Sequence, residues 1–135
     1  MAALMAPPPP PEAEAVADWA VKINRAIGSP GYPAREERIR TRARSDFARS
    51  YHPDGKVRQL AAIIGDGDRS AMLKRISAPT LVLHGADDPL VPVECGRHTA
   101  KMIPGARLHE IKGMGHDLPV ELVGEVSAAI GSIAR

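Results

Sequence analysis

The sequence TLVLHGADDPLVPVECGRHTAKMIPGARLHEIKGMGHDLP, residues 80–119, decides the fold. It begins with β-branched and apolar residues from Thr80 to His84, closed by Gly85, which is the pattern of a strand buried on both faces. Residues 93–103 place apolar or small side chains near helical spacing, and residues 106–111 form a second short apolar segment. The stretch therefore predicts a strand, a helix and a second strand.

A helix that connects two strands of one sheet makes them parallel, with a right-handed crossover. Both strands then end at the same edge of the sheet, where ligands bind in open α/β folds. Asp88 follows the first strand and His116 follows the second, so we expect their side chains to meet. Such a pair is an acid/base unit, because the carboxylate accepts the Nδ1 proton and leaves Nε2 to take a proton from a nucleophile.

Two segments carry a family resemblance: PTLVLHGADDPLVP at residues 79–92 and IPGARLHEIKGMGHDLP at residues 103–119. They resemble the C-terminal part of the α/β-hydrolase fold, specifically small microbial esterase-like enzymes that include anthracycline methyl esterases. The resemblance implies an α/β fold, a parallel sheet preceded by lid-like helices. It also implies that the triad acid, in a G-x-x-D turn, is Asp88, and that the triad histidine, in a G-x-G-H loop, is His116.

The third member of such a triad, the nucleophile, is absent from the sequence. The nucleophile elbow requires G-x-S-x-G between a strand and a helix, and the 135 residues contain no such motif. The nearest segment, residues 27–31, follows a helical pattern, and its Pro30 has no N–H for an oxyanion. Ser29 is therefore interpreted as part of a turn that ends a helix. In the family the missing nucleophile is a serine or, as in haloalkane dehalogenases and epoxide hydrolases, an aspartate.

Other side chains near these motifs have alternative interpretations. Asp87 is a competing acid one position before Asp88, and motif alignment alone favours Asp88. His84 is interpreted as a packed residue whose ring is satisfied by nearby backbone. Cys95 is expected to be a small buried residue of the crossover helix. No metal or cofactor is implied, because the histidines and the cysteine lack zinc-ligand spacing.

The chain is expected to divide into three parts. Residues 1–11 contain a proline run and are interpreted as a frayed leader or linker. Residues 12–76 carry helical patterns and, by the resemblance, correspond to a lid, in which Trp19 is either a substrate contact or a core residue. Residues 77–135 are the C-terminal core segment, ending in an amphipathic helix after Pro119 that should lie on the sheet.

Composition limits the class of partner. The 18 basic and 16 acidic residues give a net charge of +2 with no long like-charge block, so neither nucleic acid nor a membrane is implied. The arginines of residues 34–50 alternate with acidic residues, which favours a solvated helix face over an RNA-binding face. A single cysteine cannot form an intrachain disulfide, and this fits a cytoplasmic location.

These observations lead to two expectations about function. By resemblance, the full-length parent hydrolyses a small-molecule carboxylic ester, and this chain supplies the acid and the histidine but no nucleophile, so that alone it is inactive. The alternative is a non-catalytic fragment that acts by self-association or by pairing with an N-terminal half. An unpaired apolar strand edge favours such association.

Overall fold

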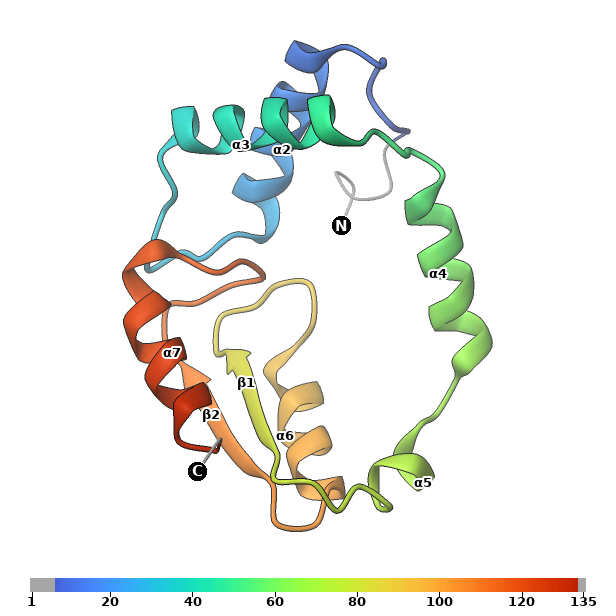
Figure 1. Cartoon of the computed structure of the whole chain (residues 1–135), viewed down its shortest axis with the longest axis vertical. Coiled ribbons are helices and arrows are strands. Elements are labelled where there is room, and N and C mark those ends of the chain that lie inside the picture. The colour runs from blue at the N-terminus through green and yellow to red at the C-terminus, as the bar shows by residue number, and fades with distance from the viewer. Residues whose placement is uncertain (1–6, 134–135) are drawn as a thin grey trace. The chain divides into compact units, whose positions relative to one another are not determined.

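The computed structural model describes residues 7–133, so the first six residues of the expected leader lie outside the described residues. The chain divides into two compact units (Figure 1). The helical unit comprises Ala34–Arg69 and the described part of Met1–Ala26. The sheet unit comprises Ile27–Pro33 and the described part of Ser70–Arg135.

The helical unit is built mainly from an arginine-rich helix and the helix before it. Its elements are α2 (Ala13–Ile27, all but its last residue), α3 (Glu36–Arg49) and α4 (Gly55–Asp66). Arg44 Nε lies 2.8 Å from Glu14 Oε1, and Arg40 Nη1 lies 2.7 Å from Asp18 Oδ1, so ion pairs join α3 to α2. The buried apolar side chains of α2 and α3 are Ala17, Val21 and Ala43.

The proline run contacts this unit. The Tyr51 hydroxyl donates a hydrogen bond to the Pro9 carbonyl oxygen at 3.0 Å, and the Glu12 N–H donates one to the Pro10 carbonyl at 2.7 Å. A distant tyrosine thus contacts the proline run, and the local sequence does not reveal this contact.

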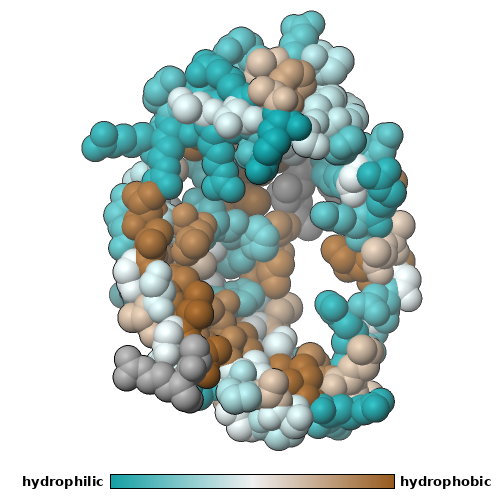
Figure 2. All heavy atoms as spheres, viewed as in Figure 1, coloured by the Kyte–Doolittle hydropathy of each residue, from teal (hydrophilic) through white to brown (hydrophobic). Residues whose placement is uncertain are grey.

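The apolar face of α4 is exposed. Its large side chains are accessible to solvent, and Figure 2 shows apolar atoms at the surface along this helix; they are Val57, Leu60, Ile63 and Ile64. The amphipathic pattern thus predicts the helix correctly, although its apolar face lacks cover within residues 7–133. No helix in this range combines the length and the apolar character needed to cross a membrane.

The sheet unit contains the strand–helix–strand unit that the sequence predicts. Its elements are α5 (Ser70–Leu73), β1 (Leu81–Gly85), α6 (Val93–Met102), β2 (Arg107–Ile111), η1 (Val120–Leu122) and α7 (Val123–Gly131). Within the described residues β1 and β2 form a parallel two-stranded sheet, with Leu81 opposite Arg107 and Gly85 opposite Ile111. The predicted parallel pairing is confirmed (Figure 1).

Helix α6 packs closely on β1 through a glycine. A Cβ built on Gly96 would lie 2.7 Å from His84 Nδ1, so a larger residue would collide with the histidine ring. His84 Nε2 lies 2.9 Å from the Val91 carbonyl oxygen, which confirms that backbone satisfies this ring. Cys95 is exposed, contrary to the prediction, because its neighbour Gly96 is the residue that faces the strand.

The terminal helix begins as a 3₁₀ turn and continues as α7. Leu122 is buried, whereas Val123 and Ile130 are about half exposed, and apolar atoms are visible over α7 in Figure 2. His109 Nε2 on β2 lies 2.7 Å from Glu125 Oε1 on α7. The predicted terminal helix is thus tied to β2, and part of its apolar stripe is exposed.

The substitution Gly85→Ala tests the close approach of β1 to the loop that follows β2. A Cβ on Gly85 would collide with the carbonyl oxygens of Met114 and Gly115, coming within 2.6 Å of the latter. Since these are backbone atoms, we expect Gly85→Ala to lower the free energy of unfolding by about 1–3 kcal/mol in urea titrations.

The matched control is Gly124 in α7, where an added Cβ meets nothing within 4 Å. Gly124→Ala should raise the free energy of unfolding by about 0.5–1 kcal/mol, because alanine favours a helix. Equal stability of the Gly85→Ala variant and the unmodified chain would contradict the close approach.

Candidate active site

Asp88 is fixed in a turn directly after β1. Its Oδ1 accepts hydrogen bonds from the backbone N–H groups of Leu90, at 2.8 Å, and Val91, at 2.9 Å. This is the way in which aspartate side chains stabilise turns. The Asp88 side chain is only 5% exposed. Its two hydrogen bonds within the turn set its position.

The environment of Asp88 favours its charged form. Burial by itself raises the pKa of a carboxyl group. Hydrogen bonds from Val91, His116 and Leu90 act in the opposite direction and prevail, so the pKa of Asp88 lies below its ordinary value. Asp88 is therefore a carboxylate at neutral pH and acts as a hydrogen-bond acceptor.

His116 lies on the loop after β2 and meets this carboxylate. Its Nδ1 lies 2.7 Å from Asp88 Oδ2. Because a carboxylate can only accept, Nδ1 must carry the proton, and in the neutral ring Nε2 is then the acceptor. The His116 side chain is 42% exposed. The structure thus brings together the two side chains that the sequence singles out, in the arrangement of an acid/base unit.

Asp87 has a different set of contacts. Its Oδ2 accepts a hydrogen bond from the Gly113 N–H at 2.6 Å, and its own N–H donates to the Met114 carbonyl at 3.0 Å. Asp87 therefore joins the turn after β1 to the loop after β2. The geometry favours Asp88, and not Asp87, as the partner of His116.

Ser29 holds the same loop from another side. Its Oγ accepts a hydrogen bond from the Gly115 N–H at 2.9 Å. Both its N–H, at 2.9 Å, and its hydroxyl donate to Asp117 Oδ1. With 4% of its surface exposed, Ser29 is buried. The serine of the elbow-like segment is therefore a structural clamp, which the sequence reasoning missed because its partners lie 86 and 88 positions away.

Backbone contacts reinforce this clamp. The His116 N–H donates a hydrogen bond to the Ile27 carbonyl at 2.8 Å. A Cβ on Gly115 would come within 2.6 Å of the Gly28 carbonyl carbon, so glycine is required at this point. The connector between α2 and α3 thus fixes the backbone at Gly115 and His116.

A pocket of about 410 Å³ lies beside the acid and the histidine. Its lining includes both of these residues together with apolar side chains, among them Leu83, Val91, Met114 and Leu118. An apolar pocket with a few convergent polar groups is the usual form of a small-molecule site. Within residues 7–133 there is no group of three or more His, Cys, Asp or Glu side chains arranged to hold a metal ion.

Comparison with known proteins gives the class of protein. No family model matches the chain. It is 42% identical over 67 residues to the rhodomycin D methylesterase DnrP of Streptomyces peucetius, a match that covers 50% of this chain and 22% of that protein. It is also 35% identical over 82 residues to a 2-hydroxy-6-oxononadienedioate/2-hydroxy-6-oxononatrienedioate hydrolase of Pseudomonas putida, covering 60% of this chain and 29% of that protein.

Solved structures agree with the sequence matches. The carbazole-degradation serine hydrolase CarC superposes with a TM-score of 0.63 at 20% identity, over 87% of this chain and 46% of that one. The esterase RhEst1 from Rhodococcus sp. ECU1013 gives a TM-score of 0.59 at 23% identity, over 90% of this chain and 44% of that one. These likenesses confirm the predicted fold class, a partial α/β-hydrolase fold.

The fold and the sequence matches identify the chain as a relative of the α/β-hydrolases that carries part of their fold. The matched proteins are named as a methylesterase and as a hydrolase. The chain spans less than a third of the length of these curated relatives and less than half of these solved structures.

Asp88→Asn tests the charge of the buried carboxylate. The pKa of Asp88 is lower in the folded chain than in the unfolded one. The ionised carboxylate therefore stabilises the fold fully above the unfolded-state pKa of about 4, and this stabilisation is lost as the pH falls through the folded-state pKa. We expect the unmodified chain to be more stable than the variant by about 1–3 kcal/mol at about pH 5, with the difference shrinking below about pH 4. Urea titrations across this range measure it, and a difference independent of pH would contradict the assignment.

Ser29→Ala tests the clamp on the histidine loop. It leaves the Gly115 N–H without its acceptor, and we expect a loss of about 1–3 kcal/mol of stability together with faster amide hydrogen exchange at Gly115 and His116. Ser127, exposed on α7, provides the control substitution Ser127→Ala, which should leave exchange at these amides unchanged. Equal exchange rates in the two variants would show that Ser29 does not hold the loop.

Proposed function

We propose that the chain supplies the acid and the general base of a carboxylic-ester hydrolase, with Asp88 as the acid and His116 as the base. The observation that carries the proposal is the 2.7 Å contact between His116 Nδ1 and Asp88 Oδ2. The exposed ring beside an apolar pocket and the names of the methylesterase and hydrolase relatives support it.

In the proposed reaction, His116 Nε2 takes the proton of the attacking nucleophile while Asp88 stabilises the imidazolium that forms. His116 then returns the proton to the leaving alkoxide, so that an alcohol departs and an acyl-enzyme remains. A water molecule, deprotonated by the same nitrogen, releases the acid. The carboxylate state of Asp88 suits this role, because an ionised partner stabilises the charged ring.

The nucleophile of this proposal comes from a segment outside the 135 residues, since the sequence has no elbow motif and Ser29 is buried in its clamp. A serine at that position gives ester hydrolysis. An aspartate gives the chemistry of haloalkane dehalogenases and epoxide hydrolases, in which His116 would activate the hydrolytic water. We further propose that residues 77–135 act as the catalytic core segment and residues 12–76 as a lid-like segment.

A second candidate function is association with another chain. The observation in its favour is apolar surface on the sheet unit: Leu108 of β2, Leu118 of the histidine loop and Val123 of α7 are all exposed. Unpaired strand edges and apolar faces recruit partners, either a second copy or the missing part of the fold. If sedimentation shows only monomer at high concentration, the result counts against this candidate.

The proposed roles can be measured in a chimera. Residues 77–135 would replace the corresponding segment of DnrP, whose nucleophile would then meet Asp88 and His116. We expect hydrolysis of rhodomycin D that falls about 10³–10⁴-fold on His116→Ala or Asp88→Asn, and that persists on His109→Ala, since His109 lies on β2 and pairs with Glu125. A folded, active chimera indifferent to His116→Ala would refute the proposal.

The isolated chain offers a complementary measurement. Without a nucleophile and oxyanion hole, it should not turn over p-nitrophenyl acetate. A burst of p-nitrophenol that disappears on His116→Ala would mean that the chain contains a nucleophile of its own.

A further inference from the structure

His84 carries the last side chain of β1 before the turn of the acid, and the proposed reaction gives it no role. Its side chain is 14% exposed, and it lines the same pocket as Asp88 and His116. His84 Nε2 lies 2.9 Å from the Val91 carbonyl oxygen and 3.9 Å from Asp88 Oδ2. The second distance is too long for a hydrogen bond, so any action of His84 on the acid is indirect.

Val91 is the residue through which His84 reaches the acid. A carbonyl oxygen can only accept, so His84 Nε2 carries the proton of this hydrogen bond. The Val91 N–H in turn donates to Asp88 Oδ1 at 2.9 Å. Val91 is therefore held at its carbonyl by a side chain of β1 and at its N–H by the acid itself.

The two oxygens of Asp88 have separate partners. Oδ1 accepts the N–H groups of Leu90 and Val91, whereas Oδ2 meets His116 Nδ1. The bonds at Oδ1 therefore fix the rotation of the carboxylate, and with it the position of Oδ2. Burial raises the pKa of Asp88, and among the hydrogen bonds that lower this pKa the one from Val91 has the largest effect.

The ring of His84 is itself held by the neighbouring helix. A Cβ on Gly96 of α6 would lie 2.7 Å from His84 Nδ1, so the helix backbone packs directly against the ring. Glu110 lies opposite His84 in the sheet, and its carboxylate accepts hydrogen bonds from Arg97 at 2.7 Å. The surroundings of His84 thus fix its ring with Nε2 at the Val91 carbonyl.

We propose that His84 is a positioning residue for the acid of the proposed hydrolase. Its Nε2–H holds the Val91 carbonyl, which keeps the Val91 N–H on Asp88 Oδ1 and leaves Oδ2 placed for His116. The consequence for catalysis rests on the proposed function. The hold on the turn does not, because it can be measured in the isolated chain.

The substitutions His84→Gln and His84→Met form a matched pair for this measurement. Both new side chains are unbranched and similar in length, but only glutamine has an N–H donor. We expect the Val91 amide to exchange about tenfold faster in His84→Met than in His84→Gln. A ¹³C titration should also give a higher pKa of Asp88 in His84→Met, because a weakened hydrogen bond favours the charged form less. Equal exchange at Val91, or an equal pKa of Asp88, overturns the proposal.

Two controls separate this effect from a general loss of stability. The Ile103 N–H bonds to the Thr99 carbonyl at the end of α6, and its exchange should be the same in the two variants. A tenfold difference at Ile103 as well would overturn the proposal, since the whole fold would then have changed. The same pair of substitutions at His98, which is exposed on α6, should leave exchange at Val91 unchanged.

The chimera with DnrP measures the consequence for catalysis. We expect kcat for rhodomycin D to be about tenfold lower with His84→Met than with His84→Gln, at similar KM, because the acid is disturbed and binding is not. Equal kcat values in an active chimera would overturn the role of His84 in catalysis. An unmodified chimera without activity would count against the proposed function alone, and the exchange comparison in the isolated chain would still decide the role of His84.

Discussion

The hydrogen bond between the Asp88 carboxylate and the His116 ring is the interaction around which the sheet unit is arranged. It requires that two strands run parallel and end at the same edge, which the pairing of β1 with β2 provides. It also requires that the loop after β2 come close to the end of β1. Gly85 permits this approach, because a side chain there would collide with the loop backbone.

The histidine loop is fixed from two directions, and this explains why the sheet unit is discontinuous in sequence. Asp87 joins the loop to the turn after β1, and Ser29 joins it to the connector of residues 27–33. The connector therefore belongs with the sheet and not with the helices that flank it in the chain. The ring position thus depends on segments nearly 90 residues apart.

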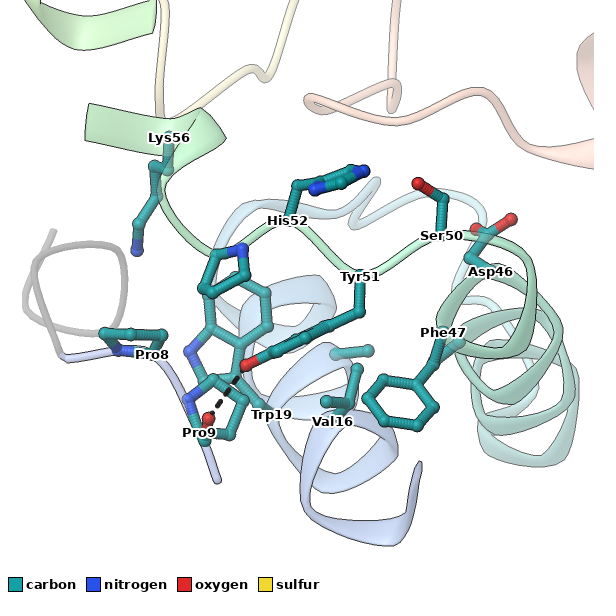
Figure 3. Close-up of a pocket in the computed structure, with 13 residues that line it drawn as sticks. Pro8, Pro9, Val16, Trp19, Asp46, Phe47, Ser50, Tyr51, His52 and Lys56 are labelled. Atoms are coloured by element: carbon teal, nitrogen blue, oxygen red, sulfur yellow. Dashed lines mark hydrogen bonds between the residues drawn. The ribbon is translucent and has the colours of Figure 1, made fainter. Parts of the chain in front are cut away.

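Local pattern was sufficient to predict the elements that carry the candidate site. The apolar runs of residues 80–84 and 106–111 predicted β1 and β2 to within one residue, and the crossover rule predicted the meeting of Asp88 with His116. The clamp of Ser29 could not be predicted, because a hydrogen bond between distant residues leaves no periodic signal. The prediction that Cys95 is buried is wrong, because its neighbour Gly96 is the residue that packs against His84. An aromatic pocket in the helical unit, lined by Trp19 among others (Figure 3), was missed because its walls come from separate segments of the sequence.

The central claim is that Asp88 holds His116 with its proton on Nδ1, leaving Nε2 to exchange protons. The most direct measurement is the ¹⁵N spectrum of the His116 ring, recorded in the neutral form of the ring, in which one of the two nitrogens carries a proton. The account predicts a protonated Nδ1 and an unprotonated Nε2 in the unmodified chain, with the proton moving to Nε2 in Asp88→Asn. A proton resident on Nε2 in the unmodified chain would contradict the account.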